Sequence, residues 1–219
     1  MPEADLSALA STEPAAVPVA GEAAVAVRKR PKPGERRVQI LQALATMLEQ
    51  PGAERITTAA LAARLDVSEA ALYRHFASKA QMFEGLIDFI EHSVFSLVNQ
   101  ITERETSGPV QAARVTGMLL QFAEKNPGMT RVMVGDALVF ENDRLQQRMN
   151  QFFDKIEASF RQSLRSAGEG EGSATPGADA QVRASLLTAF VVGRLQRFAR
   201  SGFRRLPSEH LEASLARIL

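Results

Sequence analysis

The 219-residue sequence has no cysteine and no tryptophan, and it contains one tyrosine and only three histidines. Without cysteine there are no disulfides and no thiolate metal ligands, and a reducing cytoplasm is the simplest compartment. His75, His92 and His210 are far apart in the chain, so we expect no metal site. Glycine-rich phosphate loops and nucleophile elbows are also missing, so we predict no cofactor and no enzymatic activity.

Long apolar runs are missing too. No stretch of about 18 apolar residues is present, so we expect no membrane-spanning helix. Residues 1–27 lack the basic start and unbroken apolar run of a signal peptide, and their prolines disfavour a helix. Arg28 to Arg37 then holds six basic residues and one acid. We interpret 1–33 as a disordered tail with a basic arm, which is either a solvated linker or a contact to phosphates.

The alternation typical of strands is absent, and apolar residues recur at helical spacing almost throughout. We therefore predict an all-α fold. Residues 168–177 are glycine-rich and predict a flexible loop, while the near-heptad spacing from Leu145 to Leu164 is also typical of a coiled coil. The expected helices are 35–50, a short one after Thr57 or Thr58, one from Ser68 through Phe76, 79–103, 108–125, 129–135, 145–164, 179–201 and 208–218.

Two short helices joined by a tight turn at Asp66 form a helix-turn-helix arrangement. On the second helix, Leu72 and Phe76 fall on one face and are predicted to point into the core. The opposite face is small and basic, and it consists of Ala70, Ala71 and Arg74. Small side chains let a helix enter the major groove, where an arginine can reach guanine. Short capped helices also occur in proteins that do not bind DNA, so this pattern alone leaves both interpretations open.

The stretch ITTAALAARLDVSEAALYRHFASKAQMF, Ile56 to Phe83, resembles the N-terminal domain of the TetR-type regulators. The resemblance implies a homodimer whose recognition helices enter successive major grooves of double-stranded DNA. It also implies an N-terminal three-helix helix-turn-helix domain at 34–80 and a helical dimerisation and partner-binding domain at 81–219. Many relatives have glycine at the position of Ala70. The predicted DNA-binding residues are Thr57, Thr58, Ser68, Ala70, Ala71, Tyr73, Arg74, His75 and Lys79.

A wider resemblance, from about Arg36 to the C-terminus, is to the nucleoid occlusion branch of this family. It is carried by the segment from Lys125 to Glu157 and by the terminal RFARSGFRRLP. It implies a DNA-bound inhibitor of cell division, associated with the nucleoid, that also binds FtsZ, the tubulin-like division GTPase, and antagonises its polymers. The tail at 1–33 and the 168–177 segment lie outside the resemblance.

Phe89 lies about 240° around its helix from Phe83, off the apolar stripe, and Phe95 is also off it. Such a group either packs on another helix or marks a binding surface. The resemblance places the FtsZ tail in a groove between the fourth and fifth helices. It implies the partner-binding residues Phe89, Met118, Gln121, Lys125 and Asn126. An acidic, apolar tail would suit a lysine beside apolar side chains.

Two alternatives stay open. The C-terminal apolar stripes around Leu187 and Leu215 are typical of a monomer core, whereas TetR-type relatives use such helices as a two-fold bundle. An ordinary TetR-type repressor, released from DNA by a small ligand, would have the same DNA-binding end. It would differ by enclosing a pocket instead of presenting an external groove.

Overall fold

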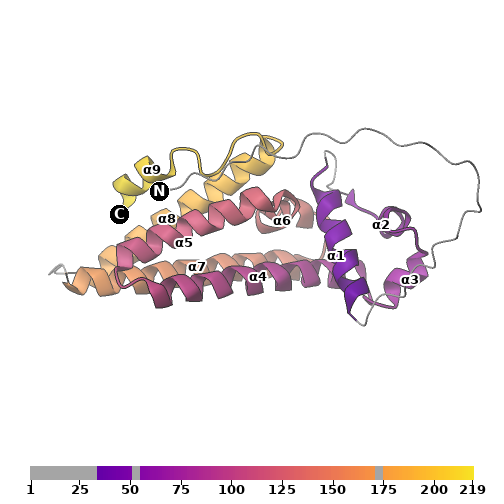
Figure 1. Ribbon diagram of the computed structural model, residues 1–219, viewed down its shortest axis with the longest axis horizontal. Coiled ribbons are helices and arrows are strands. Elements are labelled where there is room, and N and C mark those ends of the chain that lie inside the picture. The colour runs from indigo at the N-terminus through magenta and orange to yellow at the C-terminus, as the bar shows by residue number, and fades with distance from the viewer. Residues whose placement is uncertain (1–33, 51–54, 171–174) are drawn as a thin grey trace, which may run out of the picture. The chain divides into compact units, whose positions relative to one another are not determined.

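The computed structural model describes residues 34–50, 55–170 and 175–219. Within these residues the chain is helical throughout and has no strand, which confirms the predicted all-α fold (Figure 1). The predictions for the tail and basic arm at 1–33 lie outside the described residues. No helix in the described part is both long enough and apolar enough to cross a membrane.

The N-terminal helices begin where their capping residues predict. They are α1 (Glu35–Leu48), α2 (Thr58–Arg64), α3 (Glu69–Tyr73) and α4 (Lys79–Arg104). The side chains of Thr57, Ser68 and Ser78 each accept a hydrogen bond from the backbone N–H three residues later, at 3.1, 3.3 and 3.2 Å. These bonds satisfy amides that would otherwise lack a partner in the first turn. Thr57, and not Thr58, is therefore the cap of α2.

The recognition helix α3 is shorter than predicted. It ends at Tyr73 instead of Phe76, because the chain must turn through Arg74–Ala77 to reach the extended cap residue Ser78 of α4. The division predicted at residue 80 falls inside the first turn of α4. The separation into domains 34–80 and 81–219 stays a prediction.

The C-terminal helices are α5 (Gly108–Lys125), α6 (Pro127–Met133), the 3₁₀ turn η2 (Asp136–Leu138), α7 (Asp143–Gly170), α8 (Pro176–Arg200) and α9 (Leu211–Ile218). The loop predicted at 168–177 was too wide, because α7 continues to Gly170 and α8 already starts at Pro176. Helix α6 likewise starts two residues before the predicted 129. In both α6 and α8 a proline occupies the first turn, where its missing N–H is not needed.

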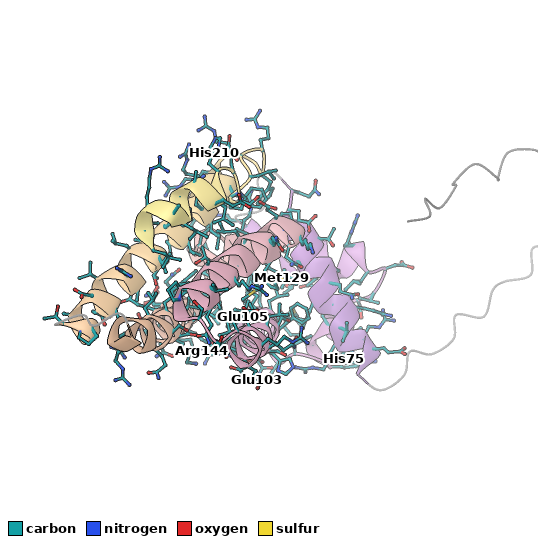
Figure 2. All side chains as sticks on the ribbon, turned by 60° about the vertical axis from the view of Figure 1, so that its left-hand side comes forward. His75, Glu103, Glu105, Met129, Arg144 and His210 are labelled. Carbon is teal, nitrogen blue, oxygen red and sulfur yellow. The ribbon has the colours of Figure 1, made fainter. Side chains whose placement is uncertain are left out.

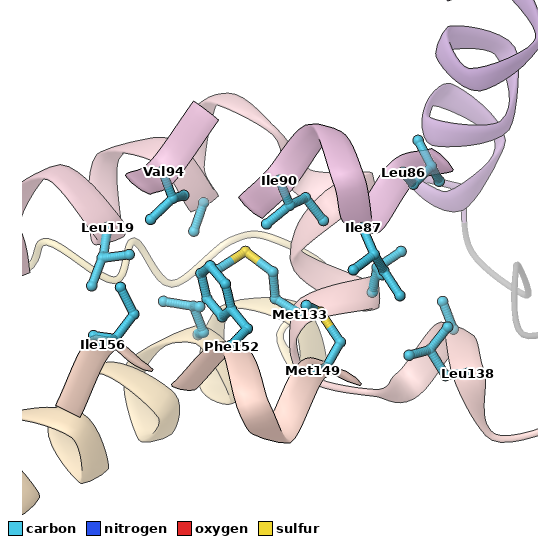
Figure 3. Packing of buried hydrophobic residues seen from close by; sticks show 14 of the residues in the cluster. Leu86, Ile87, Ile90, Val94, Leu119, Met133, Leu138, Met149, Phe152 and Ile156 are labelled. Atoms are coloured by element: carbon cyan, nitrogen blue, oxygen red, sulfur yellow. The ribbon is translucent and has the colours of Figure 1, made fainter. Parts of the chain in front are cut away.

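Helices α4, α5 and α7 enclose the largest part of the core, and α8 packs along α7 (Figure 1). Figure 3 shows Ile87, Ile90 and Val94 of α4 facing Leu119 of α5 and Phe152 of α7. All five side chains have no exposed surface. The middle of the bundle is therefore filled by the protein's own side chains, packed as in other protein interiors. A cavity of about 580 Å³ lies towards one end, between α4, α5 and α7, and is lined by Val98, Gln111 and Ser163 among others.

Leu97 belongs by its helical spacing to the apolar stripe of α4 and was expected to be buried, but it is exposed. Its side chain is 38 % exposed, whereas Val94 and Val98 on either side are buried. Leu97 lies near the edge of the stripe, and the apolar stripe is wider than the surface that the neighbouring helices cover.

Candidate functional site

The outward face of α3 is small and basic, as the helical pattern predicted. Ala70 and Arg74 are exposed and Ala71 is half-buried, whereas Leu72 and Phe76 are each 1 % exposed. Within the described part of the chain, the Arg74 guanidinium makes no hydrogen bond or ion pair. Arg74 can therefore reach a ligand without first breaking an internal contact.

A polar network joins the start of α2 to α3. The Thr58 hydroxyl donates to Glu69 Oε2 at 2.5 Å, and the Tyr73 hydroxyl lies 3.4 Å from Thr58 Oγ1. Tyr73 is 45 % exposed, and its hydroxyl is hydrogen-bonded at the tip of the side chain. This network fixes the two short helices relative to each other and leaves the edge of the tyrosine ring accessible.

Arg37 has a role that the sequence did not indicate. It ends the basic run, which was interpreted as either a solvated linker or a phosphate contact, but Arg37 lies in the first turn of α1 and its exposed side chain reaches the end of α3. Its guanidinium donates to the carbonyl oxygen of His75 and lies 4.1 Å above the Phe76 ring. His75 accordingly lies beside α1 (Figure 2). Arg37 thus holds the end of α3, and no local motif distinguishes it from the neighbouring basic residues.

Lys79, at the first position of α4, is ion-paired. Its Nζ lies 2.5 Å from Glu141 Oε1, and the Glu141 side chain is only 9 % exposed. The TetR-type resemblance implies that Lys79 contacts DNA, but Glu141 partly neutralises its charge. Arg55, just before α2, lies 4.4 Å over the ring of Phe140, next to Glu141.

The two aromatic residues that lie off the α4 stripe have different surroundings. Phe95 packs edge-on against Phe152 of α7, with 5.5 Å between ring centroids. Phe89 is 49 % exposed. The sequence placed both outside the stripe, and the packing of α7 covers only one of them.

Hydrogen bonds show which face of α5 lies against α4. Gln111 Nε2 donates to the carbonyl oxygens of Thr102 and Glu105, at 3.2 and 2.6 Å, at the end of α4. Met118 and Lys125 follow Gln111 at intervals of seven, and a heptad drifts by only about 20° around a helix. These two residues therefore lie on the α4 side of α5. Helices α4 and α5 run antiparallel, so moving 14 residues forward along α5, from Gln111 to Lys125, corresponds to moving about 14 residues back along α4 from Thr102. Lys125 therefore lies level with the part of α4 that carries Phe89.

The predicted partner-binding residues of α5 and its C-terminal cap differ in how exposed their side chains are. Gln121 is exposed, like Lys125, whereas Met118 is half-buried and packs against the core. Asn126 ends α5, and its side-chain amide donates to the Phe122 carbonyl oxygen at 2.8 Å. Phe89, Gln121 and Lys125 are therefore accessible, whereas the Asn126 side chain is engaged at the end of α5.

The described residues contain no group of three or more histidine, aspartate or glutamate side chains that could hold a metal ion. His75 and His210 lie on separate parts of the molecule (Figure 2). The chemistry of the site is therefore that of recognition by arginine, small and polar side chains, on a helix-turn-helix unit that packs through α1 against α6.

A helix-turn-helix unit whose exposed recognition face is small and ends in Arg74, attached to a helical C-terminal bundle, is the arrangement of a TetR-type DNA-binding regulator. The family model described as "Bacterial regulatory proteins, tetR family" matches residues 40–86. The SlmA-like model described as "Tetracyclin repressor-like, C-terminal domain" matches residues 109–218. The fold is shared with the MbdR regulator from Azoarcus sp. CIB (16 % identity, TM-score 0.69, covering 84 % of this chain and 97 % of that chain). It is also shared with FadR from Bacillus subtilis (14 % identity, TM-score 0.65, covering 83 % and 96 %).

The chain belongs to the family of the nucleoid occlusion factor SlmA. It is 53 % identical to SlmA of Aliivibrio fischeri over 181 residues, which cover 82 % of this chain and 92 % of that protein. It is 52 % identical to SlmA of Vibrio cholerae over 178 residues, which cover 81 % and 90 %. The predicted TetR-type and nucleoid occlusion resemblances are thus confirmed, and the protein is a DNA-binding regulator of a family that is not enzymatic.

Proposed function

We propose that the protein binds chromosomal DNA as a homodimer and binds FtsZ at the same time, so that FtsZ polymers are antagonised over the nucleoid. Membership in the SlmA family supports this function. The observation that carries the FtsZ part is Phe89, an aromatic side chain that is 49 % exposed on α4 and level with the exposed Lys125 of α5.

The DNA part rests on α3 and the ends of the neighbouring helices. We propose that Arg74 reads a base and that Ala70 and Ala71 allow the close approach this requires. Tyr73, His75 and the helix starts at Thr57, Thr58 and Ser68 contact phosphates, which position the helix in the groove without reading sequence. Lys79 contributes less to phosphate binding, because its ion pair with Glu141 partly neutralises its charge.

Arg74→Ala tests this assignment. We expect it to weaken binding to the specific site by about 1–3 kcal/mol and to change binding to random DNA little, because a base contact contributes only where the base is correct. Fluorescence anisotropy on both duplexes measures the two affinities. An equal loss on both would show that Arg74 contacts only phosphate.

The homodimer part rests on an unpaired apolar face of α8. Val182 and Leu186 are 60 % and 52 % exposed, and Ala189 and Gly193 continue the same face at helical spacing. Apolar side chains in such a row are typical of an interface. A two-fold pairing of this face would present two copies of α3 to successive major grooves.

We expect Leu186→Glu to shift the protein toward monomers and to raise the dimer dissociation constant about tenfold or more, because a carboxylate would be buried without a partner. Sedimentation velocity over a concentration series measures this. Val110→Glu, at a 38 % exposed valine on α5, is the control and should leave the dimer intact. Equal behaviour of the two variants would remove α8 from the interface.

The proposed function as a whole is tested by sedimenting FtsZ polymers with this protein, with and without specific DNA. Fewer polymers in the pellet, with the strongest effect in the presence of DNA, are expected. A ligand-gated repressor would leave the pellet unchanged.

A further inference from the structure

The segment Val139–Arg148, called here the 139–148 strap, touches both ends of the helix-turn-helix unit. It comprises the turn after η2 and the first turns of α7. Phe140 lies under the Arg55 guanidinium just before α2, and Glu141 pairs with Lys79 at the first position of α4. One short segment of the C-terminal part therefore contacts the element before and the element after the recognition helix.

Further ion pairs continue the strap along α4. Arg144 lies 2.5 Å from Glu84. Arg148 lies 2.5 Å from Asp88 and 2.6 Å from Glu91. The acids recur at intervals of four and three residues on α4, and the arginines recur at four on α7, so both sets lie in single rows at helical spacing.

The Arg148–Glu91 pair differs from isolated surface ion pairs, which contribute little because solvent screens them. Arg148 bridges two carboxylates, and the side chains of Arg148 and Glu91 are only 31 % and 18 % exposed. The hydrogen bond with Glu91 raises the pKa of the Arg148 guanidinium, and that with Asp88 raises it further. The planar guanidinium fork of Arg148, which bridges both carboxylates, fixes direction as well as distance.

We infer that the 139–148 strap positions α4, and with it the recognition helix α3, relative to the C-terminal bundle. Helix α3 connects to α4 through only the Arg74–Ser78 turn, so a tilt of α4 moves α3 as well. Arg144 and Arg148 are positioning residues that set how well α3 fits its specific DNA site. The DNA consequence of this inference rests on the proposed role of α3.

The absence of cysteine makes a direct test possible. Spin labels at Ala63→Cys on α2 and Gln151→Cys on α7, both exposed positions, report the distance between the DNA-binding unit and the bundle within one chain. Labelled protein is diluted with unlabelled protein, so that only distances within one chain are measured. We expect Arg148→Met to broaden or shift the distance distribution. A distribution that keeps its mean and width would overturn the inference.

Charge reversal separates positioning from a general loss of stability. Glu84→Arg alone and Arg144→Glu alone should each disturb the distance, whereas the double variant should restore it because the pair is rebuilt with exchanged signs. Arg114→Met is the matched control, since it breaks a pair of 2.6 Å with Glu105 that does not involve α7. Failure of the double variant to restore the distance would also overturn the inference.

DNA binding gives the second readout, on a duplex selected by the wild-type protein from a random-sequence pool. We expect Arg148→Met to weaken binding to this duplex about three- to tenfold and binding to random DNA little, because specific contacts need the correct helix position. A disturbed distance with unchanged specific affinity would overturn the DNA consequence. If the wild-type protein selects no duplex, the proposed role of α3 fails. The distance measurement still tests whether the 139–148 strap positions α4.

Discussion

Phe89→Ala is expected to weaken FtsZ binding by about 2 kcal/mol or more, roughly thirtyfold, because an aromatic side chain at the centre of an interface contributes most of its binding energy. Binding to DNA should change little, since Phe89 lies outside the helix-turn-helix unit. The side chain is already 49 % exposed, so the protein should lose far less stability than the roughly 3–5 kcal/mol typical of a truncated core phenylalanine. Binding to an FtsZ tail peptide and thermal melting measure these quantities.

Lys125→Glu extends the test to the charge of the groove. It should weaken binding of an acidic tail at low salt and have less effect at high salt, because surface charges are screened. Leu206→Ala, at an apolar residue that is 54 % exposed elsewhere on the chain, is the control. A large drop in melting temperature for Phe89→Ala, with DNA and FtsZ binding lost together, would return Phe89 to a packing role. Unchanged stability with unchanged FtsZ binding would remove the groove assignment.

Gly128→Ala is expected to destabilise the fold by about 3 kcal/mol, which lowers the melting temperature of a chain of this size by roughly 6–12 °C. Gly128 is buried near the start of α6, where this helix meets α1. An added Cβ would lie 2.9 Å from the carbonyl carbon of Ala45 and closer still to its oxygen. Because the obstacle is backbone, α6 and α1 would have to separate, and DNA affinity should fall as well.

Gly117→Ala is the matched control for this substitution. It lies inside α5, where an added Cβ would meet only Leu211 Cδ2 at 3.5 Å, an ordinary contact. Alanine is also the better helix former, so stability should stay the same or rise slightly. If Gly128→Ala melts at the wild-type temperature, the close approach of α6 to α1 is not required for the fold.

The partner-binding surface proposed around Phe89 shows how far helical periodicity can specify a site. Helical periodicity placed both Phe89 and Phe95 off the core stripe, and it could not distinguish them. The packing of α7 covers Phe95 through Phe152, and nothing in the described structure covers Phe89 in the same way. Periodicity gives the direction of a side chain from its own helix, whereas exposure depends on which other helix lies on that side.

The basic residues show the same division in the DNA-binding unit. Arg74 and Lys79 were both predicted DNA contacts, and Arg37 ended a basic run that was either a solvated linker or a phosphate contact. In the structure Arg37 holds the end of α3, Lys79 pairs with Glu141, and Arg74 alone of the three has no internal partner among the described residues. The partner of a long charged side chain is chosen by the packing of distant segments, so the sequence alone could not separate them.

The sequence by itself determined the helical class, the helix starts at Ser68 and Ser78, the start of α2 to within one residue, and the inward face of α3. Each of these depends on residues within about four positions, because a capping side chain bonds the N–H two or three residues later and a helix face repeats every 3.6 residues. Only the tertiary structure decided that Phe89 stays exposed, that Arg37 clamps α3 and that the 139–148 strap reaches α4. Those contacts join residues about 40 to 60 positions apart, and their geometry exists only once the helices have packed.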